Sequence, residues 1–527
     1  MKTAYRSLLG DKLRSRITGR VLADGASLRP YTRDQSIYQI EPLLVALPEH
    51  LEDVRQLVRF AAEEGLPLTA RGGGSGTAGS ALGEGIVMAL PGNGFWGQIG
   101  DVAVSGDQAR VRCAAGVLHN DLQQFLKQHG YFLPADVSSA EISRIGGNIA
   151  TKASGPHALK YGSIDRFLEQ VTFVTDRGEW VDTAVASSIP QRLASQLADL
   201  QRRIRGDAEA VRVLRRRQDM KIASGYNLFA FLRDLSPGPL IAQLLAGSVG
   251  SLGLLISATL RGELLKSPRA AVLGCFGSLV EAGQAVCALR NLPVAAIEII
   301  SRETVQVLRQ HTALPAGMIL NAHIVLVELI GPACLEQVEG VRRVLQGGGY
   351  RMPAPLQVAQ AETDIEALWT LRKRILWLIR HPEPHLRALS VVNDVGVPPE
   401  HLADFIHDVQ QVFARHQLVA LIYGHAGSGN LHLRPLFDIT QPDLPGRIRK
   451  LADAVYEVVF RYGGTTSAEH GMGRLRAPYL RREWGTALYG YMREVKDIFD
   501  PRGLFNPGAV FSERPITEHL RDDFTGG

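Results

Sequence analysis

The spacing of apolar residues predicts a strand, a helix and two further strands near the start of the chain. Residues 43–48 form a continuous apolar run of strand length, and residues 51–64 place Val54, Leu57, Val58 and Ala61 at helical spacing. Gly65 ends this helix, and apolar runs at 66–70 and 85–90 predict two more strands. A glycine-rich segment lies between these two strands, so we expect a loop that a β-strand leads into.

The rest of the chain alternates between strand-like and helical patterns. Strands are predicted at 109–114 and 116–118, and a helix at 120–128. The small, polar residues of 137–156 favour a loop along an extended ligand, and 184–246 is helical and basic. Beyond residue 262, strands at 295–300, 324–329 and 418–423 alternate with helices. Together these patterns predict an α+β protein.

The composition limits the class of protein. A chain of 527 residues with 45% hydrophobic and 21% charged residues indicates a globular protein of two or more domains. No apolar run reaches the roughly 18 residues that would span a bilayer, and the basic start lacks a signal-peptide pattern. We therefore expect a cytoplasmic enzyme. Its four cysteines, at 113, 275, 287 and 334, form no C-x-x-C motif, so redox chemistry would need an organic cofactor.

Two clusters of arginine stand out against a net charge of only +5. They lie in the helical region, at Arg202, Arg203, Arg205 and at Arg212, Arg215, Arg216, Arg217. They can form a solvated helix face, or they can dock a partner subunit or an anionic membrane surface. No recognition fold or interleaved aromatic pattern accompanies them, so a nucleic-acid partner is not expected.

The glycine-rich segment of residues 71–79 is a candidate phosphate-binding loop. Glycines let several backbone N–H groups approach a pyrophosphate closely, although a purely structural loop is the alternative. Residues 74–79 fit G-x-G-x-x-G, but that fingerprint requires a helix to open inside the loop, whereas here a strand is predicted next. A Rossmann unit is therefore not expected, and a P-loop is excluded because Gly-Lys-Ser/Thr is missing.

Several segments together resemble the FAD-binding domain of the vanillyl-alcohol-oxidase type flavoproteins. They are residues 71–79, 134–139, 145–148, 161–162 and 248–253, with Val249 where that family has a glutamate. The resemblance implies a two-subdomain FAD-binding domain of the p-cresol methylhydroxylase type plus an antiparallel-sheet cap domain. It also implies noncovalent FAD, because the loop at 71–79 lacks the histidine, cysteine or tyrosine used for covalent attachment.

The resemblance assigns FAD-binding residues and domain boundaries. The implied cofactor-binding set is Arg71, Gly72, Gly73, Gly74, Ser75, Gly76, Thr77, Pro134, Asp136, Ser138, Ser139, Gly146, Gly147, Asn148, Ala150, Ser154, Gly155, Tyr161, Gly162, Gly250, Gly253 and Asn506. The expected domains are a basic N-terminal segment (1–37), an FAD-binding domain (38–262, with a helical insertion at about 184–246), a cap or substrate domain (263–511) and a tail (512–527).

Two histidines, His425 and His432, bracket a glycine-rich turn between apolar flanks. A turn between two strands can bring both imidazoles to one side, and two nitrogens with a carboxylate oxygen suit a divalent ion such as zinc. Two histidines in a polar turn without a metal are the alternative. Such a metal would serve the oxidation of an alcohol, because a bound cation lowers the pKa of the hydroxyl group.

The C-terminal third resembles the D-2-hydroxyacid dehydrogenases, which include the D-lactate, glycolate and D-2-hydroxyglutarate enzymes. The motifs are the 425–432 turn, Glu469-His470-Gly471-Met472-Gly473, and Asn506-Pro507-Gly508 after Phe499-Asp500-Pro501. The resemblance implies oxidation of a D-2-hydroxy acid to the 2-oxo acid by metal-assisted hydride transfer to flavin N5. Glu469 would be the third metal ligand, His470 the general base and Arg372 the partner of the substrate carboxylate, while a helix-capping role remains the alternative for His470.

Departures from that subgroup concern the substrate. Relatives that bind a dicarboxylate carry a threonine near Leu376, a lysine near Val392 and an asparagine at the position of Arg434. Arg434 is therefore a further candidate for binding a carboxylate.

The chain ends before any iron–sulfur domain of the fused relatives, so we expect a separate electron acceptor: an iron–sulfur subunit, an electron-transferring flavoprotein or a quinone. Location at the inner membrane through a partner is compatible with this. A noncatalytic FAD-binding subunit and an oxidase that uses dioxygen are the alternative functions.

Overall fold

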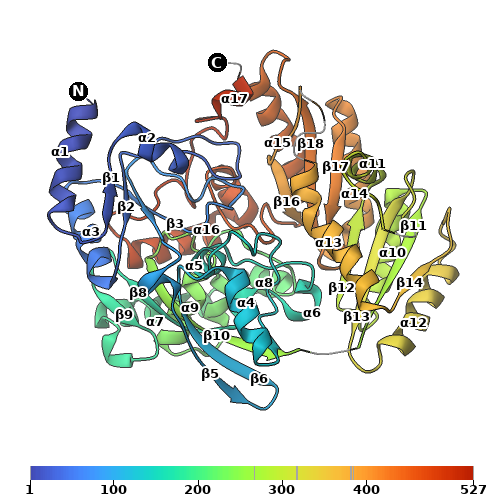
Figure 1. Ribbon diagram of the computed structural model, residues 1–527, viewed down its shortest axis with the longest axis horizontal. Coiled ribbons are helices and arrows are strands. Elements are labelled where there is room, and N and C mark those ends of the chain that lie inside the picture. The colour runs from blue at the N-terminus through green and yellow to red at the C-terminus, as the bar shows by residue number, and fades with distance from the viewer. Residues whose placement is uncertain (1, 266–267, 316–317, 380–382, 384, 526–527) are drawn as a thin grey trace.

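The computed structural model describes residues 2–265, 268–315, 318–379, 383 and 385–525, and its strands form three sheets. Figure 1 shows the first two sheets in the half of the molecule that holds the N-terminus, and the third in the other half. Each sheet has its own hydrophobic core. The candidate site described below lies where loops of the two halves meet.

The first sheet is small and mostly parallel. Its strand order is β1 (Arg20–Leu22), β2 (Leu44–Leu47), β4 (Ile86–Ala89) and β3 (Leu68–Arg71), with β2 and β3 parallel to β4. Helices α1 (Lys2–Arg14) and α3 (Leu51–Glu63) share its core, and the short α2 (Gly25–Leu28) follows β1. The predicted strands and helix are confirmed here. No helix opens between β3 and β4, and every residue of that connection is described.

The second sheet is antiparallel. Its order is β5 (Ile99–Ser105), β6 (Gln108–Ala114), β10 (Leu254–Leu264), β8 (Leu168–Val174) and β9 (Trp180–Asp182), and β7 (Tyr131–Phe132) pairs with β10. Its helices are α4 (His119–Gln128), α5 (Ile145–Thr151), α6 (Ala158–Tyr161), α7 (Gln191–Gly206), α8 (Ala208–Arg217) and α9 (Pro237–Leu245). Helix α16 (Leu480–Phe499) returns from the far end of the chain and packs into the same core.

The third sheet is antiparallel and carries helices on both faces. Its order is β14 (Gln357–Ala359), β11 (Arg269–Phe276), β13 (His323–Ile330), β12 (Ala296–Ile300), β17 (Ala420–Gly424), β18 (Asn430–Asp438) and β15 (Leu386–Ala388), with β16 (Val392–Gly396) also on β18. One core contains α10 (Leu279–Leu289), α12 (Cys334–Gly347), α14 (Leu402–Arg415) and α15 (Leu444–Arg461). The other contains α11 (Arg302–His311) and α13 (Glu362–Leu378). The last helix, α17 (Asp522–Thr525), packs on the first of these cores.

The α+β class and the antiparallel third sheet are confirmed, but two local predictions are wrong. Residues 145–151 form helix α5 rather than a loop, because Ile145 and Ile149 lie one turn apart and are both buried. Gly146 lets this helix approach Ala115, whose Cβ would lie 2.7 Å from an added Cβ. Residues 116–118 form a turn with one bridge from Leu118 to Arg144, not a strand.

Candidate active site

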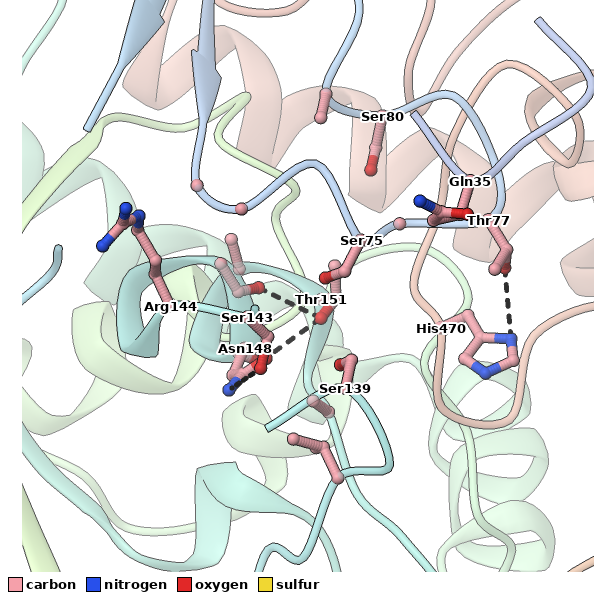
Figure 2. A pocket seen from close by; sticks show the side chains of 18 of the residues that line it. Gln35, Ser75, Thr77, Ser80, Ser139, Ser143, Arg144, Asn148, Thr151 and His470 are labelled. Atoms are coloured by element: carbon pink, nitrogen blue, oxygen red, sulfur yellow. Dashed lines mark hydrogen bonds between the residues drawn. The ribbon is translucent and has the colours of Figure 1, made fainter. Parts of the chain in front are cut away.

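A cavity of about 1630 Å³, including its part open to solvent, lies between the first two sheets and the third. One wall consists of the loop after β3, the segment after residue 136, helix α5 and the segment before β10. Figure 2 shows the hydroxyl and amide side chains of this wall around the cavity, with His470 on the opposite side. The opposite wall carries the charged residues of the third sheet and of the loop after α15.

Fifteen of the predicted cofactor-binding residues line this cavity. They are Gly72, Gly73, Gly74, Ser75, Gly76, Thr77, Ser138, Ser139, Gly146, Gly147, Asn148, Ala150, Ser154, Gly250 and Gly253. Gly147 leaves open space in the cavity, because a Cβ added there would meet nothing within 4 Å. The wall therefore offers exposed backbone to a large ligand, which fits the pyrophosphate and ring system of FAD.

The other predicted cofactor-binding residues lie outside the lining. Arg71 donates from Nη2 to the Arg33 carbonyl at 2.8 Å. Asn506 donates to the carbonyls of Ser80 (2.8 Å) and Val249 (2.7 Å), so it ties together two loops of the wall. Asn506 and Arg71 thus support the loops from behind.

Five more predicted cofactor-binding residues lie outside the lining: Pro134, Asp136, Gly155, Tyr161 and Gly162. Asp136 accepts a hydrogen bond from His157 Nδ1 at 2.6 Å, and Gly155 packs so closely that a Cβ would lie 2.2 Å from the Asp136 carbonyl oxygen. Pro134 is buried, Tyr161 packs its ring against Phe132 at 5.6 Å, and Gly162 ends α6 with a φ of 81°. His157, the partner of Asp136, also bonds Glu328 of the third sheet.

The histidine turn forms the centre of the opposite wall. His425 follows β17 and His432 lies on β18, where Tyr423 pairs with His432, and the two imidazole centroids are 5.1 Å apart. His425 donates from Nδ1 to Glu298 at 2.7 Å, and His432 donates from Nδ1 to the Asn393 carbonyl at 2.9 Å. These bonds leave the Nε2 atom of each ring available as a ligand.

Glu469 brings the two histidines together with His470. Its Oε1 lies 3.1 Å from His425 Nε2, 3.4 Å from His432 Nε2 and 3.5 Å from His470 Nε2. Its other oxygen, Oε2, accepts hydrogen bonds from Lys221 Nζ and from Ser154 Oγ. The structure therefore brings together the whole predicted ligand set of His425, His432 and Glu469.

Burial and charge set the protonation of this cluster. Burial alone would lower the pKa of His425, but the carboxylates of Glu298 and Glu469 outweigh it and raise that pKa. Burial lowers the pKa of His432 well below its usual value and also lowers the pKa of His470. Burial opposes the ionised form of Glu469, but His425 and Lys221 outweigh it and hold its pKa well below the usual range.

This donor set fits a divalent metal. Two imidazole nitrogens and one carboxylate oxygen are the ligands of many zinc sites, and Glu298 supplies the carboxylate that commonly orients a ligating histidine. Among the described residues, Asp394, His432, Glu469 and His470 also offer ligand atoms within 4.8 Å of one another. His425, His432 and Glu469 would hold the ion, since the Asp394 oxygens already accept hydrogen bonds from other groups.

Two arginines line the same wall in different electrostatic states. Arg372, on α13, forms a buried ion pair with Glu298 and stacks over the Tyr423 ring at 5.0 Å. Arg434, on β18, donates to Ser390 Oγ, its Nε has no hydrogen-bond partner, and it makes no ion pair with any described residue. Arg434 therefore brings a guanidinium to the cavity that has no acidic partner within 4 Å among the described residues.

Sequence reasoning missed Lys221, Glu298 and Asp394. Glu298 interrupts the otherwise apolar strand β12, Asp394 follows Asn393 within the buried strand β16, and both acidic residues are almost completely buried. A charged residue that interrupts an apolar strand is rarely buried without a partner, so this pattern could have identified Glu298. Lys221 follows helix α8 within the helical insertion, and no pattern in the sequence connects it with Glu469.

Comparison with known proteins matches two family models to the chain. The model of the FAD binding domain matches residues 42–184, and the model of the FAD linked oxidases, C-terminal domain, matches residues 265–510. The chain therefore carries both the FAD binding domain and the C-terminal domain of FAD linked oxidases. The cavity lies between the two matched domains.

Relatives with curated names share this domain pair. The chain is 28% identical over 526 residues to the D-2-hydroxyglutarate dehydrogenase of Escherichia coli (strain K12), covering 94% of the chain and 50% of that relative. It is 25% identical over 483 residues to the glycolate oxidase subunit GlcD of Bacillus subtilis (strain 168), covering 90% of each. The chain spans about half the length of the first of these relatives.

A solved structure confirms the fold of this protein. Its fold is similar to p-cresol methylhydroxylase with substrate bound, with a TM-score of 0.69 and 12% identity, over 96% of the chain and 97% of that protein. The predicted two-domain fold is therefore confirmed.

The arginine clusters are largely neutralised within the chain. Arg202, Arg203, Arg205, Arg212 and Arg217 form ion pairs with acidic residues, and Arg215 and Arg216 are exposed. None of the helices in the described ranges is long and apolar enough to cross a bilayer. Docking through this surface stays a prediction.

Proposed function

We propose that this protein oxidises a 2-hydroxy acid to the 2-oxo acid, with FAD in the cavity and a divalent metal at His425, His432 and Glu469. One observation carries the proposal: three imidazole nitrogens and Glu469 Oε1 converge on the cavity that the glycine-rich wall lines. When bound, FAD supplies a hydride acceptor and the metal supplies positive charge that favours ionisation of the substrate hydroxyl.

His470 is the proposed general base. Its ring lines the cavity, stacks on His432 with centroids 5.3 Å apart, and has Nδ1 3.4 Å from both Thr77 Oγ1 and Asn393 Nδ2. Because burial lowers the pKa of His470, the ring is neutral near pH 7 and can accept the hydroxyl proton. His470 would thus hold the proton that leaves when the C2 hydrogen departs as hydride.

Arg434 is the better candidate for the substrate carboxylate. Its guanidinium is buried and has no acidic partner among the residues described, whereas the charge of Arg372 is already balanced by Glu298. An arginine fork binds a carboxylate through two parallel hydrogen bonds. Arg372 then holds Glu298 in place, and Glu298 in turn holds the ring of His425. Arg372 also lines the cavity.

The substrate class follows from these groups. Val392 is buried in β16, and the side chain of Leu376 lies outside the described residues. With Val392 in place of the lysine of dicarboxylate-binding relatives, Arg434 is the replacement that this chain offers on the same wall. We propose a D-2-hydroxy acid of the lactate, glycolate or 2-hydroxyglutarate class, with electrons passing to a separate iron–sulfur subunit, electron-transferring flavoprotein or quinone.

An anaerobic screen tests the function. The FAD-loaded protein is mixed with matched D- and L-2-hydroxy acids, with one and with two carboxylates, and the visible flavin absorbance is followed. The proposal expects bleaching by at least one acid and formation of the 2-oxo acid. If none of these acids bleaches the flavin, the chain is not a 2-hydroxyacid dehydrogenase, and the noncatalytic FAD-binding role takes its place.

A further inference from the structure

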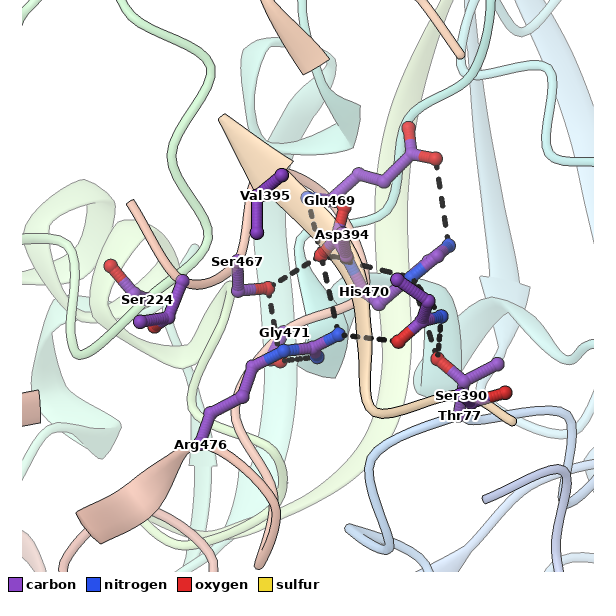
Figure 3. A network of polar contacts seen from close by, with 12 residues as sticks. Thr77, Ser224, Ser390, Asp394, Val395, Ser467, Glu469, His470, Gly471 and Arg476 are labelled. Carbon is purple, nitrogen blue, oxygen red and sulfur yellow. Dashed lines mark hydrogen bonds and ion pairs between the residues drawn. The ribbon is translucent and has the colours of Figure 1, made fainter. Parts of the chain in front are cut away.

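Asp394 is a buried carboxylate behind the candidate metal ligands. It lies on β16, between Asn393 and Val395, and its side chain is 0% exposed. Figure 3 shows it at the centre of a polar network that reaches Ser467, His470 and Arg476. It does not line the cavity, unlike Glu469 and His470.

The Asp394 carboxylate collects the backbone of the loop that carries Glu469 and His470. Oδ2 accepts from His470 N–H at 2.8 Å, from Glu469 N–H at 3.1 Å and from Ser467 Oγ at 2.8 Å. Oδ1 accepts from Glu469 N–H and from Asn430 Nδ2, both at 3.2 Å. A carboxylate has about four lone-pair sites, so these donors fill its accepting capacity.

The loop itself has little other regular structure. The Glu469-His470-Gly471 segment lies in neither a helix nor a strand, and Gly471 has a φ of 75°. Arg476, fully buried, donates to the Gly471 carbonyl at 2.6 Å and approaches Asp394 Oδ2 at 3.7 Å. Without the carboxylate, the backbone N–H groups of Glu469 and His470 would lose these acceptors, which destabilises the loop.

Glu469 and Asp394 therefore differ in what their oxygens can do. Glu469 Oε1 faces three imidazole nitrogens, whereas the donors on Asp394 are two backbone amides, a hydroxyl and a side-chain amide. Although Asp394 lies within ligand distance of His432, Glu469 and His470, its lone pairs point into the loop backbone.

We propose that Asp394 is a positioning residue, not a metal ligand: it holds the Glu469 and His470 backbone so that both side chains reach the cavity. This inference rests on the proposed function, because it assigns Glu469 to the metal and His470 to the proton. The closest contacts of the Asp394 oxygens are with the loop backbone and Ser467, and Oδ2 lies 3.7 Å from His470 Nδ1.

The test compares Asp394→Asn with a matched control. Asp53 is also a buried carboxylate that accepts from backbone amides, those of Thr18 (2.9 Å), Gly19 (3.0 Å) and Glu49 (2.8 Å), but it lies at the start of α3 in the first sheet. Wild type, Asp394→Asn and Asp53→Asn are prepared with FAD and treated with a chelator. Zn²⁺ affinity is then measured by competition with a chromophoric chelator, and hydrogen exchange is followed at the Glu469 and His470 amides.

The expected result has two parts. Asp394→Asn should weaken Zn²⁺ binding about 10- to 100-fold and speed exchange at the Glu469 and His470 amides, with the flavin spectrum retained. Asp53→Asn should change neither. Unchanged affinity and exchange in Asp394→Asn would overturn the proposal. Weaker Zn²⁺ binding with unchanged exchange would also overturn it, since Asp394 would then be a ligand.

Two further variants keep the outcomes separate. Ser467→Ala removes one donor to Asp394 and should shift both readouts in the same direction by a smaller factor, which serves if Asp394→Asn does not fold. His425→Ala defines the site: if wild type and His425→Ala bind Zn²⁺ equally, the proposed metal site fails. The exchange measurement still decides the role of Asp394 in that case.

Discussion

The two walls of the cavity differ in their residue composition. The FAD-side wall consists mainly of glycine, serine and threonine, and presents backbone to its ligand. The facing wall presents His425, His432, Glu469, Arg372 and Arg434, all at most 5% exposed. One wall recognises the shape of its ligand, whereas the other wall holds charged groups. Substitutions on the two walls should therefore have separable effects.

The largest effect is expected from filling the first wall. Gly147→Leu places a side chain where no protein atom lies within 4 Å, inside the cavity. We expect purification without bound FAD and complete loss of flavin-dependent activity. Because leucine favours a helix more than glycine does, by up to about 1 kcal/mol, the melting temperature of the FAD-free protein should not fall.

The matched control for this variant is Gly206→Leu. Gly206 is the last residue of helix α7, is exposed to solvent, and likewise has no atom within 4 Å of an added Cβ. Its flavin spectrum should be that of wild type. FAD binding by Gly147→Leu at wild-type stoichiometry would contradict the placement of FAD along α5.

The second effect concerns the charged wall alone. His425→Ala removes a proposed metal ligand, and loss of several kcal/mol of charge stabilisation should slow substrate-dependent flavin bleaching roughly 10²- to 10³-fold. The flavin spectrum should persist, because His425 is not on the glycine-rich wall. Rapid-mixing absorbance measures the rate, and the exposed His311→Ala is the control. Bleaching at the wild-type rate would contradict a role for the metal in this reaction.

The third effect distinguishes the two arginines. Arg434→Leu should raise KM roughly 10- to 100-fold, since hydrogen bonds to charged groups contribute about 1.5–3 kcal/mol. Arg434→Lys should restore part of the loss, and the exposed Arg449→Leu should leave KM unchanged. A normal KM in Arg434→Leu together with a raised KM in Arg372→Leu would return the carboxylate to Arg372.

The smallest effect is expected from a substitution of His157. His157 donates to Asp136 at 2.6 Å and to Glu328 of β13, so it links the two halves of the molecule. Burial lowers the pKa of His157, but the two carboxylates outweigh it and raise the pKa to about 10. This folded value lies above the usual 6.5, so the stabilisation is fully present below pH 6.5 and is lost as the pH rises through about 10.

His157→Gln should therefore be less stable than wild type at pH 7, by about 3 kcal/mol, with the difference shrinking towards pH 10. Urea unfolding at a series of pH values measures this, and the exposed His129→Gln provides the reference. A difference that stays constant from pH 6 to pH 10 would show that His157 is not charged in the folded protein.

The sequence predicted the first wall well because its information is local. The apolar runs around 66–70 and 85–90 place the glycine loop between two strands, and the structure has β3 and β4 there. Helix α5 was missed because the glycines that let it pack on Ala115 and face the cavity also lower its helical propensity.

The second wall was predicted only in part because it depends on contacts between distant segments. The turn between β17 and β18 fixes His425 and His432 by local pairing, so spacing alone indicated them. Lys221, Glu298, Asp394 and His157 act through partners elsewhere in the chain. The Arg372–Glu298 and Lys221–Glu469 pairs, for example, join residues 74 and 248 positions apart. No periodicity encodes such pairings.

Removing and restoring the metal in the FAD-loaded protein tests whether oxidation of the acid depends on a metal at His425, His432 and Glu469. Under anaerobic conditions, the acid that bleaches wild-type flavin is added to chelator-treated protein, and one equivalent of Zn²⁺, Co²⁺ or Mn²⁺ follows. We expect little flavin bleaching after chelation. Bleaching should recover with at least one of these ions in wild type, but not in His425→Ala. Full bleaching by the metal-free protein would contradict this dependence on a metal.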